Sequence, residues 1–90
     1  MKIARVVGSV WATKKAPSLE GARFMVIKTL SGNHSEEPGI SVATDTIGAG
    51  VGDTVLVVKG GGARLMALDA RVPVDEAIVG IIDSLELQNE

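Results

Sequence analysis

The stretch from residue 40 to residue 59 constrains the fold most, because two strand-like runs flank a glycine-rich connection. The runs, Ile40–Asp45 and Asp53–Lys59, are short, rich in β-branched residues and bounded by turn residues, a pattern that favours strands over helix. Between them lie three glycines at alternate positions: Gly48, Gly50 and Gly52. Such glycines permit positive φ and the close approach of another backbone. The sequence therefore predicts two strands joined by a tight connection that contacts a phosphate, a nucleic acid or another copy of the chain.

Three further segments have the composition of strands: Lys2–Thr13, Arg23–Leu30 and Ile78–Leu87. Gly8, inside the first of them, predicts a β-bulge or a point of close contact. The polar stretch Ser31–Gly39 has the composition of an exposed hairpin tip.

Helix is expected only late in the chain. Ala63–Ala70 contains good helix formers, and Pro73–Glu76 reads as a second short turn with acidic residues near its N-terminus. A chain of 90 residues is expected to form a single domain, residues 1–90. Five strands with one short helical segment predict a mainly β fold, a small, partly closed antiparallel barrel of the OB type. Closure removes strand edges that so short a chain could not otherwise cover.

Composition narrows the function. The net charge of −2 disfavours non-specific nucleic-acid binding, and one Trp, one Phe and no Tyr leave few platforms for stacked bases. Without cysteine there is neither a thiolate metal site nor a cysteine nucleophile. No secretory signal or membrane-length apolar run is recognisable, so a soluble, cytoplasmic protein is expected. Hydrophobic residues make up 46% of the chain, which suggests that partners cover part of the surface.

The glycine-rich motifs do not fit nucleotide sites. A G-x-G-x-x-G fingerprint beginning at Gly48 would need glycine at position 53, which is Asp53, and a strand rather than a helix follows. The run from Lys59 to Arg64 lacks the P-loop pattern. It is either an anion-binding nest or a turn from strand to helix, and the turn is favoured.

Catalytic and metal-binding readings are weak as well. His34, the only histidine, lies in the most polar loop. Four scattered carboxylates could form an acid–base pair or a site for a hard cation: Asp45, Asp53, Asp75 and Asp83. Such residues more often cap turns or pair with arginines, here Arg5, Arg64 or Arg71. We therefore expect no catalytic residue, no metal and no cofactor.

Trp11 closes the first predicted strand. It could stack on a ligand, but a single Trp in a small barrel more often packs in the core or at an interface.

Three motifs occur in order along the chain: D-x-x-G-A-G, G-x-x-A-R and P-V-D-x-x-I-V-G-I-I-D. In combination, and with further segments spanning nearly the whole chain, they resemble the EutN/CcmL family of bacterial microcompartment vertex proteins. The matching segments are Met1–Lys14, Leu19–Gly21, Ala43–Val55, Gly60 with Ala63–Arg64, and Pro73–Asp83. The chain departs from the family pattern at Gly61, Gly62 and Glu76.

The resemblance implies an OB-like barrel assembled as a cyclic homopentamer, with no enzymatic activity. Such pentamers cap the vertices of a polyhedral protein shell built mainly from hexameric tiles, in the cytoplasm. It leaves open which microcompartment is enclosed and whether the central channel is a narrow pore or is closed by packing. An OB-type module that binds oligonucleotides or small ligands is the alternative.

Within that reading, the turn Gly48–Ala49–Gly50 is expected near a subunit contact or the pore. Arg64 and Asp75 are candidates for an ion pair within or between subunits. A β-branched residue at position 50 is expected to disrupt the turn and weaken assembly.

Overall fold

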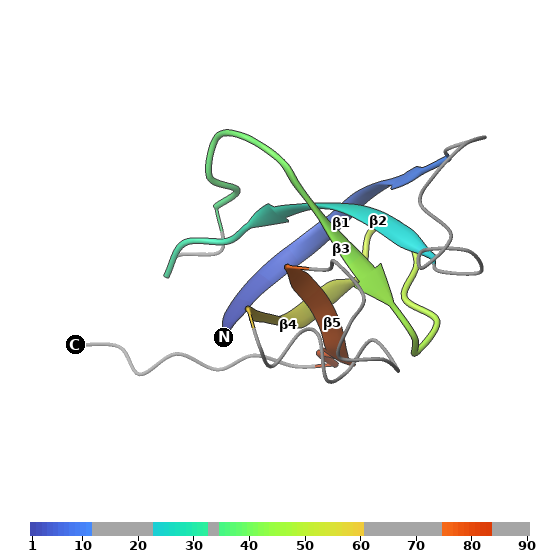
Figure 1. The fold of residues 1–90 in the computed structure, drawn as a ribbon. Helices are drawn as coiled ribbons and strands as arrows, with labels where there is room; N and C mark the ends of the chain where they lie inside the picture. The colour runs from blue at the N-terminus through green and yellow to red at the C-terminus, as the bar shows by residue number, and fades with distance from the viewer. Residues whose placement is uncertain (12–22, 33–34, 61–74, 84–90) are drawn as a thin grey trace.

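The computed structural model describes residues 1–11, 23–32, 35–60 and 75–83, which form five strands (Figure 1). The strands are β1 (Lys2–Val10), β2 (Phe24–Thr29), β3 (Ser41–Asp45), β4 (Thr54–Lys59) and β5 (Glu76–Ile81). The predicted hairpin tip between β2 and β3 is confirmed: the Ser31 N–H donates to the Ser35 carbonyl at 2.8 Å, and Leu30 bridges to Glu36.

The five strands close into a barrel in the order β1-β2-β3-β5-β4. The predicted OB-like barrel is thus confirmed, but the barrel is closed and is not antiparallel throughout. Strands β3 and β5 run parallel through the pairs Thr44↔Ala77 and Asp45↔Ile78, whereas the other four pairs are antiparallel. A closed ring with an odd number of strands cannot alternate in direction throughout, so one neighbouring pair has to be parallel.

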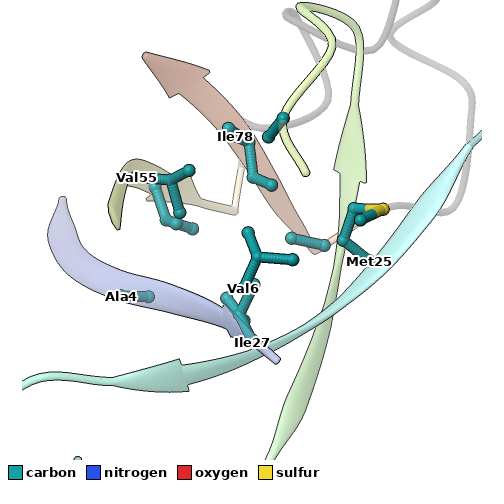
Figure 2. Packing of buried hydrophobic residues seen from close by; sticks show 9 residues of the cluster. Ala4, Val6, Met25, Ile27, Val55 and Ile78 are labelled. Atoms are coloured by element: carbon teal, nitrogen blue, oxygen red, sulfur yellow. The ribbon is translucent and has the colours of Figure 1, made fainter. Parts of the chain in front are cut away.

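Small and medium aliphatic side chains fill the barrel (Figure 2). Inward positions alternate with outward ones along β2, where Met25 and Ile27 are buried while Phe24 and Val26 are only half-buried. The same period of two recurs on β4 at Val55 and Val57. The core cluster consists of Ala4, Val6, Met25, Ile27, Ala43, Ala49, Val55, Val57 and Ile78.

Strand β1 carries a bulge where Gly8 predicted one. Its register against β2 shifts between Val6, opposite Ile27, and Gly8, opposite Val26. The extra residue, Val7, is partly exposed. Beyond the bulge, β1 continues along β2 as far as the pair Val10↔Phe24.

Two of the predicted element boundaries are wrong for reasons of pairing. β5 begins at Glu76, opposite Lys59, so Glu76 belongs to a strand and not to the predicted short helical turn. β5 ends at Ile81, earlier than the predicted strand, because its partner β4 begins at Thr54. Beyond the pair Val55↔Ile81, one further bond joins the Ile82 N–H to the Thr54 carbonyl. Residues 73 and 74 of that turn, the expected helix over Ala63–Ala70 and the expected strand beyond residue 83 lie outside the described residues.

Candidate functional site in the loop between β3 and β4

The loop of residues 46–53 is shaped at both ends by a carboxylate. Asp45 Oδ1 accepts hydrogen bonds from the backbone N–H groups of Ile47 at 3.0 Å and Gly48 at 3.1 Å. Asp53 Oδ2 accepts one from the Gly50 N–H at 2.8 Å, and its own N–H donates to the Gly50 carbonyl at 3.0 Å. Side-chain bonds of this kind replace a backbone turn. The prediction that these acids cap turns is confirmed.

Arg23 ties the loop to the start of β2. Its Nη1 lies 2.9 Å from Asp45 Oδ2, and its Nη2 donates to the Ala49 carbonyl at 2.8 Å. The Asp45 side chain is fully buried, whereas that of Arg23 is half-exposed. The contact with Oδ2 is an ion pair and not an aligned hydrogen bond, so this buried oxygen accepts no hydrogen bond.

This pairing was missed from sequence, where the expected arginine partners were Arg5, Arg64 and Arg71. Arg5 pairs instead with Glu36: its Nη1 lies 3.9 Å from Glu36 Oε2, and both side chains are partly exposed. Strand register carries the signal that could have found the true pair. Residue 23 precedes β2, residue 45 ends the antiparallel β3, and the Asp45 N–H donates to the Arg23 carbonyl at 2.9 Å.

The loop is also fastened to β1 and to the core. The Gly52 N–H donates to the Val6 carbonyl at 2.8 Å, and the Val6 N–H donates to the Asp53 carbonyl at 2.9 Å. The Ala49 side chain is fully buried among the core residues. Within the predicted contact turn, therefore, the side chain of Ala49 faces its own barrel, and only the backbone and the flanking glycines face outward.

Within residues 47–52 of the loop, four backbone N–H groups donate to acceptors of the chain itself. The N–H groups of Ile47 and Gly48 go to Asp45, that of Gly50 to Asp53, and that of Gly52 to Val6. A phosphate-binding loop needs such donors to be free and convergent. The loop is therefore no phosphate cradle, in agreement with the failed nucleotide fingerprint.

Two of the three glycines are required by backbone conformation. Gly48 has φ +90° and Gly52 has φ +97°, a region that L-residues with side chains rarely adopt. Gly50 lies outside that region, and a Cβ there would meet only Asp53 Oδ2, at 3.9 Å, an ordinary contact. The sequence predicted that a β-branched side chain at position 50 would disrupt the turn. Within one chain, the contacts at Gly50 do not support that prediction.

What the loop offers to a partner is apolar. Ile47 is 43% exposed and Val51 is 67% exposed, although the backbone that carries them is held at both ends and in the middle. A fixed backbone with outward aliphatic side chains loses little conformational entropy when it packs against another protein. The arrangement suits a protein contact and offers no reactive group.

A second polar cluster lies where β1 and β5 begin and β4 ends. Glu76 is buried, and its Oε2 lies 2.7 Å from Lys2 Nζ and 4.0 Å from Lys59 Nζ. The Thr44 hydroxyl donates to the Glu76 carbonyl at 3.4 Å. From sequence, Glu76 is assigned to a short helical turn and noted as a departure from a family pattern, and no ion pair is expected for it. Its position shows an ion-pair cluster that joins three strand ends.

The remaining candidates do not gather into a site. Asp75 is exposed, and its carbonyl accepts the Gly60 N–H at 2.8 Å; Arg64 lies outside the described residues, so that ion pair stays a prediction. His34 also lies outside them, and Asp83 is exposed. Over the described ranges, no group of three or more His, Cys, Asp or Glu residues could hold a metal, and no helix could span a membrane.

Trp11 is 91% exposed, which rules out the core as its place within one chain. Of the two packing roles expected for it, only a contact with something outside its own barrel remains.

Comparison with known proteins identifies the family. The family model described as ethanolamine utilisation protein EutN/carboxysome matches residues 1–83. The chain belongs to the EutN/CcmL family. It is 42% identical over 89 residues to the carboxysome shell vertex protein CcmL of Thermosynechococcus vestitus, covering 99% of this chain and 90% of that one.

Two solved structures extend the likeness of this EutN/CcmL-family chain to its fold. Gloeobacter violaceus CcmL superposes with a TM-score of 0.93 at 36% identity, covering 99% of this chain and 92% of that one. GrpN of Rhodospirillum rubrum, a pentameric microcompartment shell protein, superposes with a TM-score of 0.89 at 34% identity. The match covers 98% of this chain and 100% of GrpN.

The different conformations of the loop glycines lead to a first prediction for this EutN/CcmL-family chain. Gly48→Ala forces a side chain into positive φ and should cost about 1–2 kcal/mol of stability, whereas Gly50→Ala should change it by less than about 0.5 kcal/mol. Denaturant unfolding at one fixed protein concentration measures both. Equal losses would show that position 50 is restricted by something beyond its own chain.

Arg23 provides a second prediction. Arg23→Ala removes the ion-pair partner of a buried carboxylate and should cost about 1–3 kcal/mol. The matched control is Arg5→Ala, which breaks a partly exposed pair of 3.9 Å and should cost no more than about 0.5 kcal/mol. The same unfolding assay compares them, and an Arg23→Ala variant as stable as Arg5→Ala would contradict the role given to Arg23.

Proposed function

We propose that this chain is a structural shell protein whose pentamers cap the vertices of a polyhedral bacterial microcompartment. The observation that carries the proposal is the match over nearly the full length, in sequence and in fold, to a carboxysome shell vertex protein and to a pentameric microcompartment shell protein. Both carboxysomal and other microcompartment proteins stand among these relatives, so the type of compartment is left open.

The physical logic of this function is geometric. A sheet of hexagons is flat, and its closure into a polyhedron requires five-fold units at the corners. A contact between two unlike surfaces of one chain generates a ring when its rotation closes. The product of such a protein is a shape, so the chain acts as a building block and not as an enzyme.

Its partners follow from the same geometry. Each subunit binds two neighbours of its own kind, and the outer edge of the pentamer docks against hexameric shell tiles. Asp45 and Asp53 cap turns, Glu76 pairs with lysines at strand ends, and four N–H groups of residues 47–52 bond within the chain. This use of the polar groups supports a structural role. No observation favours the OB-type module for oligonucleotides or small ligands.

We place the turn Gly48–Ala49–Gly50 at a subunit contact or beside the central channel. The fixed backbone of the loop and its exposed Ile47 and Val51 support this placement. The exposed Asp75 is available for the ion pair proposed with Arg64.

The proposal predicts the mass of the particle. Light scattering on the purified chain at micromolar concentration should give a mass near five times the 9.3 kDa of one chain. The ring is held by apolar contacts, so this mass should persist when the salt concentration is raised. A monomer at micromolar concentration would contradict the proposal.

A further inference from the structure

We propose that Trp11 is the anchor of the subunit contact and that it packs against Ile40 and Val42 of a second copy of this chain. The inference rests on the proposed pentamer and names the two surfaces that form its ring. It is carried by three observations: the exposure of Trp11, the apolar outer face of the β1–β2–β3 sheet, and the positions of these features at opposite ends of that sheet.

Trp11 is unusual for a side chain of its size. At 91% exposure, it is the most exposed of the large hydrophobic residues among those described. Trp is enriched at protein interfaces and is a frequent hot spot there. Burial of one Trp removes about 200 Å² from water. One side of a standard interface buries about 800 Å², so Trp11 alone supplies about a quarter of it.

The receiving surface is the outer face of the sheet near the start of β3. Val26 and Val42 are directly paired, and Gly8 lies on the other side of Val26. The row Gly8–Val26–Val42 is therefore aliphatic. Because Gly8 has no side chain, nothing projects from that end of the row. Ile40 is 64% exposed and Val42 is 46% exposed, an apolar pair unpartnered within the described part of the chain.

The two surfaces lie at opposite ends of the sheet. Trp11 follows Val10, whose row runs through Phe24 to Thr44, near the end of β3. Ile40 precedes the start of β3, where Ser41 pairs with Ile27. Five residues of strand separate the rows of Trp11 and Ile40, about 16 Å. In Figure 1, β1 ends at the upper right of the view and β3 starts at the upper left.

This separation determines the kind of contact. Two unlike apolar surfaces far apart on one chain cannot meet within that chain, and they pair head to tail between copies. A second copy is therefore the occupant that suits both surfaces at once. A single-stranded nucleic acid would also stack on Trp11, but the aliphatic Ile40 and Val42 offer it no base platform, and the net charge of −2 opposes it.

The fluorescence of the single Trp tests the anchor directly. In the wild-type protein, emission should be blue-shifted and protected from acrylamide at concentrations where light scattering finds five chains. Upon dilution to monomers it should shift to the red. Val42→Ser should expose Trp11 at concentrations where the wild type is assembled. Ile81→Ser, at a residue of similar exposure on β5 (41%), should leave emission unchanged.

Removal of the anchor should weaken assembly. Trp11→Ser should raise the concentration for half-dissociation by about 30-fold or more, the effect of a hot-spot residue. Circular dichroism of the dilute variant checks that the barrel is still folded. A folded Trp11→Ser variant that assembles like the wild type, or an assembled wild type with solvent-exposed Trp11, would overturn this inference and leave the pentamer standing. A monomeric wild type would overturn both.

Crosslinking tests the pairing, because the chain has no cysteine of its own. Ser9→Cys lies two residues before Trp11, on the same face of the strand. Lys28→Cys lies on the outer face of β2, one residue beyond Ile27, which pairs with Ser41 beside Ile40. When the two single variants are co-expressed, a bismaleimide should link one chain of each kind, while neither variant alone should form linked pairs. Links within one variant only, or no link in an assembled mixture, would overturn the head-to-tail pairing. If an oligo-dT probe binds the monomer tightly and shifts the Trp11 emission to the blue, the partner of Trp11 is a nucleic acid and not a second copy of the chain.

Discussion

The structure depends on the insertion of β5 between β3 and β4, which closes the barrel. β5 pairs with β4 over five positions and with β3 over two, so it is the only described strand to have one parallel and one antiparallel neighbour that both come earlier in the chain. This closure buries Ile78 against the other core residues and satisfies both edges of the sheet. It also determines where charge lies, because the first residue of β5, Glu76, is brought between Lys2 and Lys59.

The same closure leaves the polar groups of the barrel occupied by one another. Asp45 is buried beside the point where β3 meets β5, and its charge is met by Arg23, while its second oxygen shapes the 46–53 loop. Among the exposed side chains of the described residues are large apolar ones: Trp11, Ile40, Val42, Ile47 and Val51. Exposed apolar side chains on a chain whose loop and strand-end carboxylates are already paired are typical of a subunit that packs against other proteins.

The sequence predicted what depends on local patterning. Short runs rich in β-branched residues and bounded by turn residues located β2 and β4 to within one residue at each end, and Gly8 marked the bulge in β1. The predictions from sequence failed where pairing between distant segments determines the structure. Glu76 looks like a helix start because acids favour that position, but its place opposite Lys59 makes it a strand residue. Arg23 could not be matched to Asp45 without the register of β2 and β3. Residue type alone left Trp11 a choice between core and interface, and its position after the last β1–β2 pair leaves it exposed.

Native mass spectrometry tests the central claim most directly, because it counts the chains in the assembled particle. We predict that the purified protein gives one dominant species of five chains, with dissociation into monomers and no stable species of six. A dominant monomer, or a six-chain particle, would contradict the assignment of this chain to a five-fold vertex.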